Sequence, residues 1–150
     1  MRGMDDLWMG TALRLAREAA ARGDVPVGAV VVSGGEVAGS AGNSREASAD
    51  PTAHAEIVAL RAAAARLGRW NLSDCDLYVT LEPCAMCAGA AVLARLRRLV
   101  YGAADPKAGA CGSALDVLGS RRLNHRVQVV AGICADECAE LLRSFFVGRR

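Results

Sequence analysis

Hydrophobic residues recur every three or four positions between residues 5 and 22, and this spacing predicts an amphipathic helix. The apolar run 25–32 and the shorter apolar stretch 37–41 predict two strands. The tetrapeptide 33–36 between them contains two adjacent glycines, which is typical of a hairpin turn. The first part of the chain is therefore predicted to form a helix followed by an antiparallel hairpin.

Helical and strand patterns alternate along the rest of the chain. They predict helices over 51–67, 83–95 and 135–146, strands over 77–81, 99–102 and 127–130, irregular segments over 43–50 and 103–113, and a helical turn over 115–118. Pro51 and Pro83 each follow an acidic residue, and proline is favoured in the first turn of a helix. One helix separates strands 77–81 and 99–102, so we expect them to run parallel in a right-handed βαβ unit. Together these elements predict a single domain spanning residues 1–150, with an α/β fold of three α/β/α layers and a mixed five-stranded sheet.

Composition narrows the class of protein. With 53% hydrophobic and 23% charged residues in 150 positions, the chain is typical of a globular domain and not of a disordered protein. A net charge of +2 excludes an extended basic arm. Neither a membrane-spanning apolar run nor a signal peptide is recognisable, so we expect a cytoplasmic protein with reduced thiols and no membrane partner. In that compartment the six cysteines indicate metal or redox chemistry before disulfides.

Two short motifs carry the candidate chemistry: His54-Ala55-Glu56 and Pro83-Cys84-Ala85-Met86-Cys87. Cys84 and Cys87 are three positions apart, and near a helix N-terminus their thiolates can bind one ion. With the imidazole of His54 they make three ligands for Zn²⁺, and a three-ligand site leaves a fourth position open for catalysis. Glu56 is then the candidate proton shuttle. Residues two apart on a regular helix point about 200° apart, so His54 and Glu56 must lie at an irregular first turn.

Each motif has a less specific interpretation when taken alone. His54 would more often be a structural histidine, and Glu56 a solvated helix residue. Cys84 and Cys87 could form a redox pair or half of a four-ligand structural zinc site. The combination of H-x-E with a later P-C-x-x-C is more specific, because it is the signature of zinc-dependent base deaminases.

The chain resembles the bacterial tRNA-specific adenosine deaminases of the cytidine deaminase superfamily. The resemblance extends over nearly the whole sequence and is carried by Asn43 and by segments 25–29, 50–56, 81–90, 105–107, 124–127 and 135–138. It implies a cytidine-deaminase-like fold, a homodimer, and one Zn²⁺ per subunit held by His54, Cys84 and Cys87. The implied reaction is hydrolytic deamination of adenosine to inosine at the wobble position of a tRNA, typically an arginine tRNA. A zinc-activated hydroxide would attack C6 of adenine, with Glu56 as the proton shuttle.

The resemblance also implies contacts with the tRNA anticodon stem-loop. Asn43 matches a residue that contacts the target nucleoside, and Asp105 and Lys107 match a loop that lies against RNA. Phe146 lies among arginines near the end of the chain, and an aromatic ring beside cations suits base stacking. A phenylalanine at this point of a helix could instead anchor the helix to the core.

Two other function classes remain open at this stage. The zinc motifs are shared with deaminases of free bases and nucleosides, such as guanine, cytosine or cytidine, so the motifs alone do not identify the substrate. A non-enzymatic zinc or redox module built around Cys84 and Cys87 is the second, and it would leave Glu56 dispensable.

Overall fold

The computed structural model describes residues 2–147 and 149 of the chain. The elements are α1 (Arg2–Ala21), β1 (Gly28–Ser33), β2 (Glu36–Gly42), α2 (Arg45–Ser48), α3 (Ala55–Leu67), β3 (Cys75–Leu81), α4 (Ala85–Leu93), β4 (Arg98–Ala103), β5 (Gln128–Ala131) and α5 (Ala135–Phe146). Within the described ranges, no helix has both the length and the hydropathy needed to cross a bilayer.

The five strands form one mixed sheet in the order β2-β1-β3-β4-β5. Strand β1 is antiparallel to both β2 and β3, whereas β3 and β4, and β4 and β5, are parallel. The predicted antiparallel hairpin and the parallel pair around α4 are therefore confirmed. Because only β1 is reversed, the carboxyl ends of β2, β3, β4 and β5 all lie at the same edge of the sheet.

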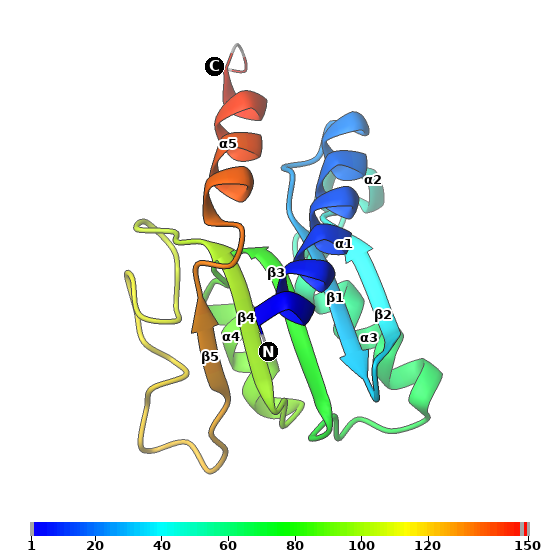
Figure 1. The fold of residues 1–150 in the computed structure, drawn as a ribbon, viewed down its shortest axis with the longest axis vertical. Coiled ribbons are helices and arrows are strands. Elements are labelled where there is room, and N and C mark those ends of the chain that lie inside the picture. The colour runs from blue at the N-terminus through cyan, green and yellow to red at the C-terminus, as the bar shows by residue number, and fades with distance from the viewer. Residues whose placement is uncertain (1, 148, 150) are drawn as a thin grey trace.

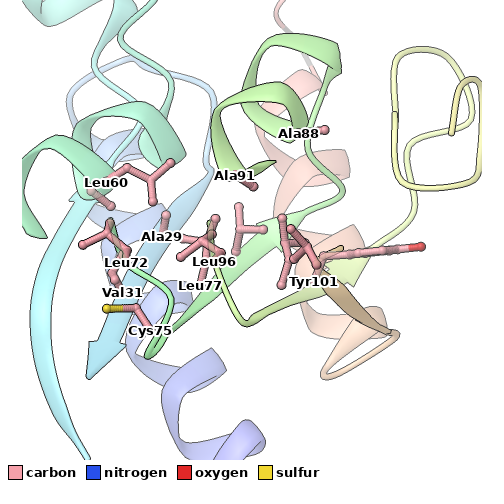
Figure 2. Close-up of a cluster of buried hydrophobic side chains, with 14 of the residues drawn as sticks. Ala29, Val31, Leu60, Leu72, Cys75, Leu77, Ala88, Ala91, Leu96 and Tyr101 are labelled. Carbon is pink, nitrogen blue, oxygen red and sulfur yellow. The ribbon is translucent and has the colours of Figure 1, made fainter. Parts of the chain in front are cut away.

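Helices cover both faces of the sheet, which confirms the three-layer α/β/α fold (Figure 1). Helices α1 and α5 pack on one face, where Met9, Leu13 and Val100 belong to one buried cluster. Helices α3 and α4 pack on the other face. Figure 2 shows the second cluster there, to which Leu60 of α3, Leu77 of β3 and Ala91 of α4 all belong. The central strands β1 and β3 are buried on both sides, which explains why most of their residues are apolar.

Two helices begin later than the prolines predict. Helix α3 begins at Ala55 and not at Pro51, because residues 50–53 form a turn of their own. In that turn Oδ1 of Asp50 accepts hydrogen bonds from the backbone N–H of Thr52 at 2.9 Å and from its hydroxyl at 2.8 Å. Asp50 therefore caps a turn and not a helix. Helix α4 likewise begins at Ala85, two residues after Pro83, and it ends at Leu93.

Two further local predictions are wrong. The segment 43–50, predicted to be irregular, contains the one-turn helix α2. The buried carboxylate of Asp24 accepts hydrogen bonds from the N–H groups of Glu46 at 2.8 Å and Ala47 at 3.3 Å, which stabilises this turn from a distant position in the sequence. Residues 115–118, predicted to form a helical turn, instead bend around an isolated bridge between Cys111 and Asp116.

A buried ionic network joins α1 to the strands β3 and β4. The carboxylate of Asp5 accepts a 2.9 Å hydrogen bond from the Arg98 guanidinium and a 2.8 Å hydrogen bond from the Tyr78 hydroxyl. Arg98 also pairs with Asp76 at 3.2 Å. Burial alone would raise the pKa of Asp5, but the hydrogen bonds from Arg98 and Tyr78 outweigh it and lower that pKa.

Candidate metal centre and substrate pocket

Three polar residues follow the carboxyl ends of parallel strands and line one cavity of about 180 Å³. Asn43 comes directly after β2, Glu82 directly after β3, and Asp105 two residues after β4. In open α/β sheets, ligands bind outside the carboxyl ends of strands. For comparison, a cavity of about 150 Å³ accepts benzene, so this one suits a single planar ring system.

His54 and Cys84 line this cavity, and the buried Cys87 lies directly beside them. His54 is the residue before α3, Cys84 is the residue before α4, and Cys87 lies in the first turn of α4. Nδ1 of His54 lies 3.6 Å from Sγ of Cys84 and 3.5 Å from Sγ of Cys87. The sequence therefore placed these three residues correctly in one cluster.

The cluster has the donor types and the spacing that a zinc ion needs. Zinc binds cysteine sulfur at about 2.3 Å and histidine nitrogen at about 2.0–2.1 Å in tetrahedral geometry, which separates the nitrogen and sulfur ligands by roughly 3.5 Å. The two measured N···S distances match that separation. The three candidate ligand atoms all lie within 4.8 Å of one another. The residues present therefore fit a zinc ion, with a fourth coordination position open to a small ligand.

The local environment favours a thiolate at Cys84. A hydrogen bond from the Cys87 side chain, together with backbone N–H groups of Cys87 and Met86, lowers the pKa of Cys84 to about 5. The same sulfur pair raises the pKa of Cys87, and burial raises it further. The hydrogen bonds to Cys84 therefore stabilise its thiolate form. The exposed N–H groups at the start of α4 give it the electropositive surroundings in which thiolates bind metals.

Glu56 lines the same cavity and is only 4% exposed. The backbone of His54 is extended, with φ of −63° and ψ of 148°, whereas Glu56 lies in the first turn of α3. This confirms the irregular helix start that the H-x-E motif requires. Burial raises the pKa of Glu56 to about 7, despite the nearby His54. A carboxyl group with this pKa can take up and release a proton near neutral pH.

The remaining walls of the cavity combine apolar and polar groups. Its apolar lining consists of Val25, Val27, Ala55, Leu81 and Ala108. The buried Asn43 side chain donates a 3.3 Å hydrogen bond to the Val25 carbonyl and accepts one from the Arg45 N–H, also at 3.3 Å. The Arg45 side chain lines the cavity too, and sequence reasoning missed it because α2 was not predicted.

Lys107 and Phe146 lie outside the cavity and line a neighbouring groove of about 860 Å³. Phe146 is 51% exposed, and Arg143 and Arg149 line the same groove. Phe145 is half-buried, and the Arg149 guanidinium stacks 4.1 Å above its ring. The structure thus brings Lys107 and Phe146, two of the predicted RNA contacts, together in this groove, whereas Asp105 lines the cavity.

Glu82 is a residue of the site that sequence reasoning also missed. It is 2% exposed and accepts hydrogen bonds from the N–H groups of Asp105 at 3.0 Å, Cys111 at 3.0 Å and Ser113 at 3.1 Å. Burial would raise its pKa, but these hydrogen bonds and one from the Ser113 hydroxyl lower it. The available signal was an acidic residue directly after a mostly apolar strand, at the edge of the sheet where ligands bind.

Comparison with known proteins is consistent with this geometry. A family model described as MafB19-like deaminase matches residues 4–150. The tRNA-specific adenosine deaminase of Bacillus subtilis (strain 168) is 45% identical over 142 residues, which cover 95% of this chain and 88% of that protein. A solved structure from a study of A-to-I editing by tRNA:A34 deaminases at the wobble position of transfer RNA is 47% identical, with a TM-score of 0.87 over 90% of this chain and 98% of that chain.

A more distant solved structure has a different substrate. The guanine deaminase from Nitrosomonas europaea is 27% identical, with a TM-score of 0.79 over 95% of this chain and 84% of that chain. The family model matches nearly the whole sequence, and the identity to the tRNA deaminases is higher than that to the guanine deaminase. These two findings decide to which family the chain belongs. The chain therefore belongs to the MafB19-like deaminase family, as an enzyme of the tRNA-specific adenosine deaminase branch with a cytidine-deaminase-like fold.

Proposed function

We propose that this protein deaminates adenosine to inosine at the wobble position of a tRNA, with an arginine tRNA as the substrate. The observation that carries the proposal is one cavity in which a buried carboxyl group, Glu56, lies beside the cluster of His54, Cys84 and Cys87. The similarity to enzymes that act on tRNA adenosine supports the choice of substrate. The anticodon loop is single-stranded, so its bases enter a pocket at a lower cost than bases of a duplex.

His54, Cys84 and Cys87 would hold one Zn²⁺ per subunit. When bound, this ion supplies Lewis-acid activation of water, so that hydroxide is available as a nucleophile near neutral pH. A closed structural zinc site would need a fourth ligand, whereas the cluster consists of three residues and opens onto a cavity. This arrangement favours a catalytic centre over a non-enzymatic zinc module.

Glu56 would carry the protons of the reaction. Hydrolysis replaces the C6 amino group of adenine with oxygen and releases ammonia, so a proton must leave water while protons reach the ring nitrogen and the departing amine. A buried carboxyl group with a pKa of about 7 can accept the first proton and return it. Glu56 is 4% exposed and lines the cavity, so its carboxyl group adjoins the space that the reacting nucleoside would occupy.

The walls of the cavity would hold the target nucleoside. Val25, Val27 and Leu81 supply apolar surface for the faces of a purine ring. Asn43 offers an amide, and Asp105 a carboxylate, at the edge of the same space, where they can bind polar atoms of the nucleoside. The oxygen Oδ1 of Asp105 already accepts the N–H groups of Lys107 at 3.1 Å and Ala108 at 3.2 Å, which fixes its orientation.

The groove lined by Lys107 and Phe146 would bind the nucleotides around the target. It combines three cationic side chains with an exposed aromatic ring, which are the groups that bind phosphates and stack on unpaired bases. Its position beside the loop that contains Asp105 would let one anticodon stem-loop occupy the groove and the cavity together.

We also propose that the protein acts as a cytoplasmic homodimer. An apolar hollow of about 440 Å³ lies between α3 and α4, with Trp70 66% exposed and Leu93 73% exposed at its rim. Large exposed apolar side chains that gather around one hollow are typical of a protein interface. A second copy of this chain is the occupant that the resemblance to the homodimeric family favours.

The second candidate function is deamination of a free base, and the similarity to a guanine deaminase favours it. One experiment separates the two. Purified zinc-loaded protein is incubated with an anticodon stem-loop that has adenosine at the wobble position, with the same RNA carrying guanosine there, and with free adenosine, adenine, cytidine, cytosine and guanine. Inosine and ammonia from the first RNA alone are expected. Turnover of a free base alone would contradict the tRNA assignment.

A further inference from the structure

The carboxylate of Glu82 has no hydrogen-bonding capacity left for a substrate, although it borders the cavity. Its Oε1 atom accepts the N–H of Asp105 at 3.0 Å and the hydroxyl of Ser113. Its Oε2 atom accepts the N–H groups of Cys111 at 3.0 Å and Ser113 at 3.1 Å. A carboxylate has about four lone-pair sites, and all four have partners here. Glu82 therefore binds protein and not ligand.

The four partners come from both ends of one loop, residues 105–113. Two backbone hydrogen bonds of residues 82 and 83 also hold this region. The Glu82 N–H donates to the Ala103 carbonyl at 2.8 Å, and the Pro83 carbonyl accepts from the Ala110 N–H at 2.8 Å. The next residue in the chain is Cys84. The loop is thus fixed directly to the segment that positions the metal ligands.

Gly109 shows how closely the loop approaches the carboxylate. A Cβ atom at this position would lie 2.4 Å from Cδ and 2.5 Å from Oε1 of Glu82, and 2.6 Å from the carbonyl oxygen of Asp105. Real Cβ atoms essentially never approach non-bonded atoms this closely, so a larger residue at position 109 would force the loop backbone, the Glu82 side chain or both to shift. The backbone at Gly109 therefore leaves no space for a side chain beside the Glu82 carboxylate.

The same loop forms part of two surfaces. Asp105 and Ala108 line the cavity next to the metal cluster, whereas Pro106 and Lys107 line the neighbouring groove. A shift of the loop would therefore change both surfaces at once, whereas Glu56 and Cys87 lie on α3 and α4, and His54 and Cys84 lie directly before these helices. We propose that Glu82 is a positioning residue for substrate binding, which holds loop 105–113 so that the cavity and the groove bind one RNA substrate together.

The predicted change in KM rests on the proposed function, whereas the predicted change in the loop's hydrogen exchange does not. In the Glu82→Gln variant, one of the two acceptor oxygens becomes an N–H₂ group. This donor group would then face backbone N–H donors. We expect zinc content to remain at one per subunit, the KM for the stem-loop RNA to rise about tenfold, and kcat to change by less than about threefold. Hydrogen exchange at the amides of Asp105, Cys111 and Ser113 should accelerate, whereas the amides of α4 should keep their protection.

Asp76→Asn is the matched control, because Asp76 is a carboxylate of similar burial, 5% exposed, on the strand β3 and bound to Arg97 and Arg98. It should lower the melting temperature without affecting exchange in loop 105–113 or the KM. Gly109→Ala is a second, independent way to displace the loop, and it should reproduce the exchange and KM changes while Glu82 is intact.

The outcomes separate this proposal from the assignment of substrate. Exchange is measured without substrate, so unchanged exchange in loop 105–113 of both Glu82→Gln and Gly109→Ala overturns the inference whatever the enzyme deaminates. Exchange that rises equally throughout the protein, or a loss of kcat with an unchanged KM, overturns it as well, because Glu82 would then act on global stability or on the chemical step. Local loop exchange together with a KM effect supports it.

Discussion

Nδ1 of His54 lies 3.5 Å from Sγ of Cys87, although 33 residues separate them in the sequence. Each residue lies at the start of a helix, and the two helices pack side by side on one face of the sheet. The fold therefore brings together two helix N-termini, whose N–H groups favour thiolates and bound anions. The metal cluster and the proton-transfer group Glu56 both depend on this arrangement.

Replacing Glu56 by Gln should abolish turnover and leave metal binding intact. The amide keeps the size of the side chain but cannot carry a proton, and loss of a general acid–base group typically costs about 10²–10⁴-fold in rate. The measurement is kcat on the wobble-adenosine stem-loop, with zinc per subunit determined on the same sample. A Gln variant that retains more than about a tenth of wild-type kcat would show that Glu56 is not the proton shuttle.

Replacing Cys87 by Ser should remove the metal and lower the melting temperature. Metal binding contributes to folding where the site forms only in the folded state. The control is Cys134→Ser, which changes a half-buried thiol outside the cluster and should keep one zinc per subunit. Elemental analysis and thermal unfolding of both variants, with and without a chelator, check this. Equal zinc content in the two variants would refute the ligand assignment.

Replacing Lys107 by Ala should weaken RNA binding and reduce its dependence on salt. Each lost phosphate contact reduces the slope of log K against log salt by about 1. Arg66→Ala is the control, because Arg66 is an exposed cation on α3, on the opposite face of the sheet from α5. Binding of the stem-loop is measured across a salt series. Identical slopes for the wild type and the Lys107 variant would exclude a phosphate contact at this position.

Replacing Leu93 by Glu should convert the proposed dimer to a monomer. A carboxylate would then replace an apolar side chain at the hollow between α3 and α4, where burial against a partner carries a large desolvation cost. Leu115→Glu, at a leucine that is 56% exposed but outside the hollow, serves as the control. Sedimentation or light scattering gives the mass of each variant. If both variants keep the wild-type mass, the interface lies elsewhere or the protein is already monomeric.

Replacing Asp5 by Asn should reduce the free energy of unfolding near pH 7 by about 1.5–3 kcal/mol, the range for hydrogen bonds to charged groups. The folded-state pKa of Asp5 is lowered from 3.8, so its contribution to stability is complete above that value. As the pH falls from about 3.8 through the folded-state pKa, the contribution is lost and the two proteins should converge. Denaturant unfolding at a series of pH values measures this difference. A constant difference down to pH 2 would contradict the assignment.

Local patterns in the sequence were sufficient for most elements of the fold. Helix 135–146 was predicted with its observed bounds, and the hairpin turn was recognised from Gly34 and Gly35, which adopt the positive φ values of 59° and 78°. One prediction failed because a distant side chain decides the local conformation. The short helix α2 depends on Asp24, some 20 positions earlier in the chain, and no periodicity within 43–50 reveals that contact.

The chemistry of the centre follows from the amino-acid sequence, because H-x-E and P-C-x-x-C specify donor atoms by residue type and spacing. The alternation of helices and strands follows from it too, since that pattern is local. Which polar residues share the cavity depends instead on how the strands pair. The antiparallel placement of β1 puts the ends of β2, β3 and β4 at one edge, and thereby Asn43, Glu82 and Asp105 around one space. Strand direction depends on contacts between distant segments, which no single stretch of sequence contains.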